Sequence, residues 1–529
     1  MAPRAGSSPV HPERSGSPAP GEGGPRSRRT TRPALALCAL LLGTYAYFFQ
    51  AGGWNQNSRF DLVRAMVEDG QFEIDRFEKN TGDDSIRNGH HYCDKAPGSS
   101  WLCTPTYAAM YWLSGSPRDY GPLWLAWAAW LAIVLAVAVP SAIAAVFLAR
   151  LARAMGLARW IQITCALVWG LATMALPYST LLYGNQLAAS FLLIGFVLLV
   201  EVRRGAAPTA AAMLAAGGCL GMAGACEYPA ALVMAPIALY GLVVLGRRRA
   251  WAGLAWAALG GALPLAAVAA YHNAAFGSPT AFPYDFSVWE APHTGWFMGI
   301  GMPRWQAIRG TFVGEHRGLL YVMPWIVLAV PGAIVLGRRY AAEVAVCAWA
   351  VIALVWLNVS IKPWHGGWAT GPRYVVPMLP FLVVLASGVL PWLRWPGRAA
   401  PAVRRAVIAA ALAVGLGAVG WSAAHMFAAT AVKPEISELN KRPYATEVWP
   451  HFRAGRLSIS TQSMDSDRNH KGGPRQAWNL GMKAGLDGHA SLVPLYLWWF
   501  LCGLWLARGL RAEIVPAPAP APVSEPVPP

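Results

Sequence analysis

Charge is scarce in this sequence, and acidic side chains are scarcer than basic ones. Charged residues make up 13% of the 529 positions, with 26 Asp and Glu against 43 Lys and Arg. Hydrophobic residues make up 55%. Apolar runs of roughly 18 to 25 residues recur from residue 33 to residue 507, long enough to cross the hydrocarbon core of a bilayer. We therefore predict an all-α polytopic membrane protein.

Basic residues gather at the ends of alternate hydrophobic runs, which is the positive-inside pattern of a cytoplasmic face. The clusters lie at 26–32, 150–159, 203–204, 247–249, 338–339, 394–405 and 508–511. Placing them in the cytoplasm gives about twelve transmembrane helices with both termini cytoplasmic, near 33–53, 121–149, 158–177, 183–201, 207–225, 229–246, 250–271, 318–336, 341–361, 374–392, 404–424 and 489–507. The net charge of +17 is then explained by topology, so no nucleic-acid partner is implied.

Low-complexity segments lie only at the two ends of the chain. Residues 1–32 are basic and rich in Pro, Gly and Ser, and residues 508–529 are rich in Pro and Ala, so we predict disordered cytoplasmic tails around a membrane domain at 33–507. We do not expect the first span to be a cleavable signal, because the stretch before it is long and no A-x-A-like site precedes the polar loop. The exported side receives 54–120, 272–317, 362–373 and 425–488, which contain most of the polar chemistry.

Repeats and metal-binding spacings are also absent from the sequence. An internal repeat is the usual mark of a transporter. The eight cysteines are scattered, and no Cys/His spacing resembles a zinc site. We predict no cofactor; a divalent metal is compatible with the residues but not required by them. Cys93 and Cys103 both fall on the exported face, where a disulfide and two free thiols are the open alternatives.

The first exported loop begins with a stretch of helical periodicity, SRFDLVRAMVE at 58–68. Apolar side chains lie on one side of it at three- and four-residue spacing: Phe60, Val63, Met66 and Val67. We expect this helix to lie along the membrane interface with its apolar face down, Ser58 and Asp61 forming a capping box at its start. Residues 99–114, SSWLCTPTYAAMYWLS, are too short to span, and we predict a re-entrant helix there.

Five stretches of the chain carry a family resemblance. They are SRFDLVRAMVEDGQF (58–72), GHHYCDKAPG (89–98), YHNAAFGSP (271–279), HRGLLYVMP (316–324) and GGWATGPRYVVPMLP (366–380). In this order they resemble the C-type (GT-C) glycosyltransferases that use polyprenyl-phosphate sugars, in particular bacterial aminoarabinose transferases and protein mannosyltransferases. The resemblance implies a GT-C-like fold in the bacterial inner membrane. It also implies inverting transfer of a sugar from a polyprenyl-phosphate donor to a lipid, glycan or protein acceptor on the periplasmic side.

The sequence departs from this family at one position that matters. Its members carry an acidic residue just before the interfacial helix, and that carboxylate activates the acceptor. Gln56 and Asn57 stand there in this chain, and an amide cannot take up a proton at useful pH. Either the base has moved, or the chain is a catalytically inactive binding or assembly subunit. A transporter or flippase for a lipid-linked substrate is a third alternative, but the span interiors are nearly free of the charges that it would need.

Glycosyl transfer from a lipid phosphate needs a carboxylate for the acceptor proton and cations for the leaving phosphate. Asp61 and Asp94 are the candidate carboxylates; the alternatives are a capping acid and an ion pair with Lys95. We assign the phosphate to Lys95, Arg317 and Arg373. Both arginines precede predicted spans at their outer mouths, where interfacial anchoring is the alternative role.

Candidate substrate contacts come from three exported segments: His91, Tyr92, Glu227, Trp364, His365 and Trp368. Glu227 lies in a short turn between two spans, where an acid is costly unless it is paired or faces water. Trp364 and Trp368 flank His365 and two glycines, a position suited to stacking on a sugar ring, with interfacial anchoring as the alternative. Solvated loop positions are the alternative for the histidines, including His90.

Overall fold

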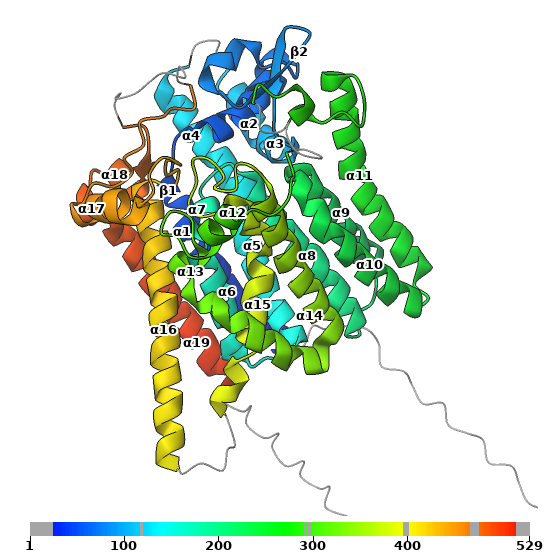
Figure 1. The fold of residues 1–529 in the computed structure, drawn as a ribbon, viewed down its shortest axis with the longest axis vertical. Coiled ribbons are helices and arrows are strands. Elements are labelled where there is room, and N and C mark those ends of the chain that lie inside the picture. Colours follow the sequence, from blue (N-terminus) through cyan, green and yellow to red (C-terminus); the bar gives the residue numbers. More distant parts are fainter. Residues whose placement is uncertain are drawn as a thin grey trace, which may run out of the picture.

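The computed structural model describes residues 25–116, 120–289, 293, 299–394, 401–465 and 475–514. Helices dominate it, as the composition predicts, and Figure 1 shows them standing side by side beneath a cap that contains α2, α3 and β2. The longer helices are α1 Pro25–Ala46, α2 Trp54–Arg64, α3 Gly98–Leu113, α4 Pro122–Ile133, α5 Val139–Ala154, α6 Arg159–Leu171, α8 Gly184–Arg203, α9 Ala210–Cys226, α10 Ala231–Arg247, α11 Trp251–Phe276, α12 Trp305–Phe312, α14 Ala329–Ser360, α15 Leu379–Ser387, α16 Pro401–Val432 and α19 Val493–Ile514. The shorter ones are α7 Ala175–Tyr178, α13 Leu319–Val322, α17 Trp449–Arg453 and α18 Leu480–Lys483.

Eight helical segments in the described part of the chain are long and apolar enough to cross a membrane: Pro122–Ala154, Gly184–Arg203, Tyr228–Arg247, Trp251–Phe276, Pro324–Ser360, Arg373–Trp392, Ala402–Val432 and Gly488–Leu510. Two shorter apolar helices, Pro33–Ala46 and Ala210–Cys226, accompany them. The segment Pro324–Ser360 joins two predicted spans. It breaks at Tyr340, whose φ of −129° and ψ of 41° are not helical, beside the basic pair 338–339. The multi-pass class is confirmed, and the count of about twelve spans stays a prediction.

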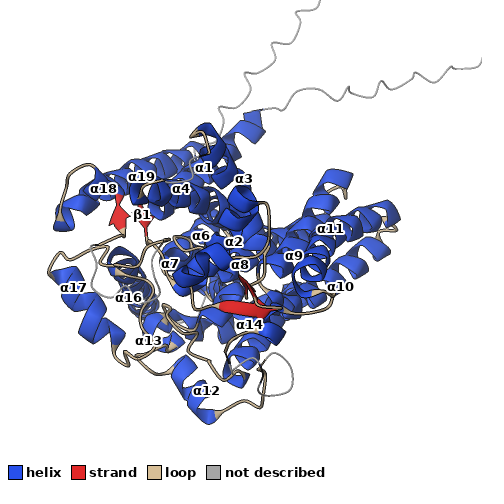
Figure 2. Ribbon diagram, turned by 90° about the horizontal axis from the view of Figure 1, so that it is seen from above, coloured by secondary structure: helices blue, strands red, loops and turns tan. Residues whose placement is uncertain are grey.

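Small residues allow α9 and α11 to pack closely. A Cβ atom placed on Gly217, Gly221 or Gly260 would collide with backbone carbonyl oxygens of the facing helix, so the two backbones approach as in small-residue interfaces of membrane helices. In Figures 1 and 2, α9, α10 and α11 form a group at one side of the bundle, away from α16 and α19. This group supplies one wall of the cavity described below.

Four short strands form two antiparallel pairs, which Figure 2 shows in different parts of the molecule. β1 (Phe48–Phe49) pairs with β4 (Trp478–Asn479), and β2 (Asp84–Arg87) pairs with β3 (His90–Cys93). The first pair joins the chain just after α1 to the last exported segment. Gly52 extends this link, because its N–H donates to the carbonyl of Gln462 at 3.1 Å. Residues 430–465 are thereby held beside the start of α2.

The β2–β3 hairpin turns at Asn88 and Gly89, whose φ values are 52° and 82°. Positive φ at both central residues is the type I′ turn that Asn-Gly favours. The register pairs Asp84 with Cys93, so Asp83 and Asp94 lie together at the open end of the hairpin. We did not predict these strands, although the Asn-Gly pair is a strong hairpin signal.

The helix predicted at 58–68 exists, but its start and surroundings differ from the prediction. α2 begins at Trp54, and Ser58 lies inside it and contacts Cys93 Sγ at 3.3 Å, so the capping box with Asp61 is wrong. All residues from 55 to 64 are buried, including Arg59, Asp61 and Arg64, because α3 and the hairpin pack over the helix. The expected interfacial helix with one wet face is therefore replaced by a helix enclosed on all sides.

Both predicted tails are helical where they adjoin the membrane domain. Helix α1 starts at Pro25 and α19 continues to Ile514, so helix extends into both predicted tails. Residues 1–24 and 515–529 lie outside the described residues.

Cys93 and Cys103, the two possible partners of a disulfide, are free and buried. The thiol of Cys103 donates to the carbonyl of Ala132 at 3.8 Å. The re-entrant path predicted for 99–114 corresponds to α3, and its depth in a bilayer stays a prediction.

Candidate active site

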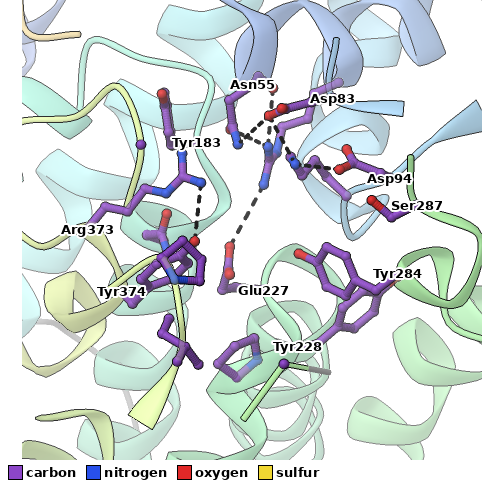
Figure 3. Close-up of a pocket in the computed structure, with 18 of the residues that line it drawn as sticks. Asn55, Asp83, Asp94, Tyr183, Glu227, Tyr228, Tyr284, Ser287, Arg373 and Tyr374 are labelled. Atoms are coloured by element: carbon purple, nitrogen blue, oxygen red, sulfur yellow. Dashed lines mark hydrogen bonds and ion pairs between the residues drawn. The ribbon is translucent and has the colours of Figure 1, made fainter. Parts of the chain in front are cut away.

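A cavity of about 1510 Å³ lies beneath the cap, where the segments predicted to be exported meet the ends of α9, α10 and α11 nearest the cap. Figure 3 shows carboxylates, cations and tyrosines from several elements pointing into it. Its ionisable and aromatic lining includes Trp54, Arg59, Asp83, Asp94, Lys95, Tyr183, Glu227, Tyr228, His272, Tyr284, Trp289, His365, Trp368, Arg373, Tyr374, Lys433, Glu435 and Glu438. The cavity therefore combines charge of both signs with stacking surfaces.

One arm of the cavity is apolar. It is formed by side chains of α10 and α11 together with Gly224 of α9: Leu232, Met234, Leu265, Val268 and Ala269. Leu232 and Leu265 are 37% and 42% exposed, so apolar side-chain surface is available in this arm. A hydrocarbon chain fits such a surface, whereas a sugar or a nucleotide does not.

Lys95 holds two carboxylates at the open end of the hairpin. Its Nζ lies 2.7 Å from Asp94 Oδ2 and 3.0 Å from Asp83 Oδ2. Burial lowers the pKa of Lys95, but the two carboxylates outweigh burial and raise it above its usual range. Burial alone would raise the pKa of Asp83, but the charges of Lys95 and Arg373 outweigh burial, and the pKa of Asp83 is lowered. The pKa of Asp94 is raised, because burial and the charge of Asp83 outweigh the charge of Lys95. Lys95 therefore favours the ionised form of Asp83, which also benefits from the charge of Arg373.

Arg59 and Glu227 form a second charged pair across the cavity. Arg59 Nη2 lies 3.8 Å from Glu227 Oε2, and Arg59 Nε donates to Ser99 Oγ at 3.0 Å. Burial raises the pKa of Glu227, although Arg59, Arg373 and Lys95 oppose the effect. Glu227 was expected to be either paired or functional; it is paired, and it also lines the cavity.

Arg373 differs from Lys95 and Arg59 because no carboxylate of the described residues is in ion-pair contact with it. Its guanidinium carbon lies 5.4 Å from the ring centre of Tyr183 and 5.2 Å from that of Tyr374. One Nη atom donates to Tyr374 Oη at 3.4 Å. Stacking between two tyrosines fixes the guanidinium while leaving donors for an anion. Lys433 is nearby in the lining, with Nζ 4.8 Å from the ring centre of Trp368.

Glu435 is a buried carboxylate of the lining that we did not predict. Its Oε1 accepts a hydrogen bond from Tyr183 Oη at 3.0 Å, and its Oε2 accepts one from Gln56 Nε2 at 3.2 Å. Burial raises its pKa to about 7, although Tyr183, Lys433 and other neighbours oppose the shift. A carboxylate from the segment 425–488 thus touches Gln56, at the position where the family resemblance predicts an acid.

Six of the predicted site residues line the cavity: Asp94, Lys95, Glu227, His365, Trp368 and Arg373. The remaining predicted residues do not line it: Asp61, His91, Tyr92, Arg317 and Trp364. Asp61 is fully buried, and its Oδ1 accepts from Asn80 Nδ2 at 3.0 Å. Burial raises the pKa of Asp61 well above its usual range despite the charge of Arg64. This position separates Asp61 from any acceptor in the cavity.

Arg317 has a structural environment rather than a phosphate site. It is fully buried, and its Nη and Nε groups donate to the backbone carbonyls of His365, Gly367, Ala369 and Ile436. Burial lowers its pKa to about 10. The guanidinium therefore fastens the segment 362–373 to the segment that carries Glu435, with four of its five N–H donors used on backbone carbonyls.

The other predicted loop residues also have protein partners. His91 lies between Asp84 and Glu78, with ring nitrogens 2.6 Å and 3.0 Å from their carboxylates. Tyr92 Oη donates to Glu73 at 3.1 Å, and His90 Nδ1 lies 2.7 Å from Asp75. The Trp364 ring packs edge-on near His316, at 6.2 Å between ring centres. These contacts shape the cap and lie outside the cavity lining.

The sequence carries weak signals for some of the lining residues that we missed. Asp83 belongs to the acidic pair of the predicted exported loop, and Tyr183 is the first residue of the span predicted at 183–201. Nothing in the sequence links Glu435 to Gln56, because their contact depends on tertiary pairing. Within the described residues, no three His, Cys, Asp or Glu side chains are grouped as metal ligands, and the divalent metal left open by the sequence stays open.

No protein-family model matches the chain, and no curated protein is similar to it. Solved structures similar to it include ArnT from Cupriavidus metallidurans bound to undecaprenyl phosphate, with 18% identity and a TM-score of 0.44 over 92% of this chain and 76% of that chain. Both that protein and the next are members of the GT-C fold. The second is the archaeal oligosaccharyltransferase AglB from Archaeoglobus fulgidus in complex with an inhibitory peptide and a dolichol-phosphate. It has 11% identity and a TM-score of 0.44 over 85% of this chain and 61% of that chain.

Proposed function

We propose that this chain is a glycosyltransferase of the bacterial inner membrane that uses a polyprenyl-phosphate sugar on the periplasmic side. It transfers the sugar to a hydroxyl group of a lipid, glycan or protein acceptor. The observation that carries the proposal is the composition of one cavity. Lys95 and Arg373 line the same cavity as an apolar arm that includes Leu232 and Leu265. An amphiphile with an anionic head and a hydrocarbon tail matches both parts.

Arg373 is the principal phosphate ligand in this proposal. It lines the cavity, is stacked between Tyr183 and Tyr374, and has no carboxylate in ion-pair contact among the described residues. A bound phosphate would supply the missing counter-charge. Lys433 supports this role from the same cavity, whereas Lys95 is already held by Asp83 and Asp94.

The reaction is a single displacement at the anomeric carbon. The acceptor oxygen forms a bond to that carbon, the bond to the phosphate oxygen breaks, and the electron pair leaves with the phosphate. Cations fixed by protein contacts stabilise the charge that develops on the leaving group. A carboxylate of the cavity takes the proton of the acceptor hydroxyl. Attack opposite to the leaving phosphate inverts the configuration of the sugar.

Lipid binding by the purified protein in nanodiscs tests the phosphate assignment. Undecaprenyl phosphate should raise the melting temperature, and undecaprenol, which lacks the phosphate, should do so much less. Arg373→Ala should weaken phosphate-lipid binding by roughly 10- to 100-fold, as expected for the loss of a charged hydrogen-bonding group. The matched control is Arg442→Ala, an exposed arginine outside the lining that pairs with Glu315 at 3.1 Å. Equal binding of the two lipids, or of Arg373→Ala and the wild type, would refute the assignment.

Turnover is tested in cells by mass analysis of lipids and glycans from a deletion strain beside the wild type. One missing sugar mass is the expected result. Retained binding of the phosphate lipid with no change in any glycoconjugate would instead identify the chain as a non-catalytic binding subunit, the alternative that the amides of Gln56 and Asn57 favour.

A further inference from the structure

The amide at position 56 removes the carboxylate expected before the first exported helix, and the fold brings another carboxylate to the same place. We propose that Glu435 is the general base for the acceptor hydroxyl, a role that rests on the proposed glycosyltransferase function. Glu435 lines the cavity, and its Oε2 is 3.2 Å from Gln56 Nε2. The carboxylate has moved along the sequence while keeping its place beside α2.

The backbone around Glu435 is fixed on both sides. Thr370 Oγ1 donates to the carbonyl of Pro434 at 2.6 Å, and the N–H of Ala369 donates to the carbonyl of Ile436 at 3.0 Å. Arg317 donates to the same Ile436 carbonyl at 3.1 Å. A base must keep its orientation toward the reacting atoms, and a residue anchored through its two chain neighbours meets that requirement.

Three of the four other carboxylates that line the cavity are in ion-pair contact with Lys95 or Arg59. Asp83 and Asp94 hold Lys95, and Glu227 lies 3.8 Å from Arg59. Glu438 contacts the ring of His365 at 3.0 Å. Glu435 instead receives hydrogen bonds from two neutral groups, Tyr183 and Gln56, and no ion pair of Glu435 occurs within the described ranges. A carboxylate held by neutral donors keeps more of its basicity than one neutralised by an ammonium group.

The proton balance of the step is simple. Glu435 takes the proton from the acceptor hydroxyl as the acceptor oxygen bonds to the anomeric carbon. The bond between that carbon and the phosphate oxygen breaks, and the departing phosphate carries the electron pair to Arg373. The protonated carboxyl then releases its proton to water once the products have left, which restores the base.

The first test is Glu435→Gln, which keeps the side-chain shape and removes the basicity. We expect kcat for transfer from a polyprenyl-phosphate sugar to fall by about 10²- to 10⁴-fold, the usual contribution of a general base, with little change in binding of undecaprenyl phosphate. The control is Glu447→Gln, an acid outside the cavity lining that accepts from Asn440 at 3.1 Å. It should transfer at the wild-type rate.

An exchange variant separates a base from a structural carboxylate. Glu435→Gln alone places an amide against the amide of Gln56. The double variant Gln56→Glu with Glu435→Gln restores one acid and one amide across the same 3.2 Å contact. We expect its kcat to be at least 10-fold higher than that of Glu435→Gln, because a carboxylate again stands in this contact at the edge of the cavity. A melting temperature that recovers while kcat stays at the level of Glu435→Gln would overturn the proposal.

The pH profile gives a readout that a packing role would not change. Groups facing Glu435 are Tyr183, Gln56, Lys433 and Arg373, and burial raises the pKa of Glu435 to about 7. The base acts when ionised, so kcat should rise with pH through about 7 and then level off. Glu435→Gln should lose this rise. If the wild type transfers the sugar and Glu435→Gln transfers it at the same rate, the role of Glu435 as base is refuted while the glycosyltransferase function stands. If the wild type neither binds the phosphate lipid nor transfers a sugar, the proposed function and the role of Glu435 are refuted together.

Discussion

Replacing Arg317 distinguishes a clamp between two exported segments from a ligand for phosphate. Its guanidinium donates to four buried carbonyls, those of His365, Gly367, Ala369 and Ile436. A hydrogen bond from a charged group stabilises the fold by roughly 1.5–3 kcal/mol, but burying the cation costs several kcal/mol. We therefore expect Arg317→Met to lower the free energy of unfolding by about 2–4 kcal/mol. Arg317→Lys should also lose stability, because one ammonium group cannot reach four separated acceptors.

Thermal unfolding in detergent, followed by tryptophan fluorescence, measures the effect. Both Arg317 variants should melt several degrees below the wild type, and both should bind undecaprenyl phosphate at a temperature where they remain folded. Arg442→Met, at an exposed site paired with Glu315, serves as the control and should melt with the wild type. An Arg317→Met protein that melts like the wild type but has lost phosphate-lipid binding would refute the clamp and restore the phosphate assignment made from the sequence.

Three further predictions concern Lys95, Leu265 and Glu435. Lys95→Met leaves Asp83 and Asp94 buried without their cation, which should cost about 3–5 kcal/mol of stability; adding Asp94→Asn should recover part of the loss in thermal unfolding. Leu265→Trp narrows the apolar arm, so it should raise KM for a long-chain donor by at least several-fold and leave KM for a short-chain donor nearly unchanged. Burial raises the pKa of Glu435 from 4.5 to about 7, so the folded chain binds more protons than the unfolded chain in that range. Stability should fall as pH rises from 4.5 to 7, and a flatter profile is expected for Glu435→Gln.

Membrane helices were the part of the fold that the sequence predicted best. The expected spans at 207–225, 229–246 and 250–271 correspond to α9, α10 and α11, because long apolar runs and basic ends are local signals. The first exported loop was predicted less well. Its helix α2 lost its expected exposed face because α3 and the β2–β3 hairpin cover it, and a hydrophobic pattern alone does not report such covering.

The candidate site was predicted in part. Lys95 and Arg373 line the cavity because they lie directly at a hairpin end and a span mouth, positions that the sequence marks. Asp61 and Arg317 fit the same chemical criteria but point into the protein, where Asn80 and backbone carbonyls surround them. Charge and position along the chain do not determine the direction of a side chain. Glu435 was missed for the opposite reason, since its partners are distant in sequence.

The proposed role of Glu435 beside Gln56 has a structural requirement, which is that the two segments that carry them keep a fixed relation. Pairing of β1 with β4 and the bond from Gly52 to Gln462 hold the last segment beside α2. Arg317 then fixes Ile436, next to Glu435, against the segment 362–373. With both links in place, the carboxylate of Glu435 lines the cavity and stays 3.2 Å from the amide of Gln56. Under the proposed mechanism, an amide at position 56 is therefore compatible with catalysis, provided that the clamp of Arg317 remains.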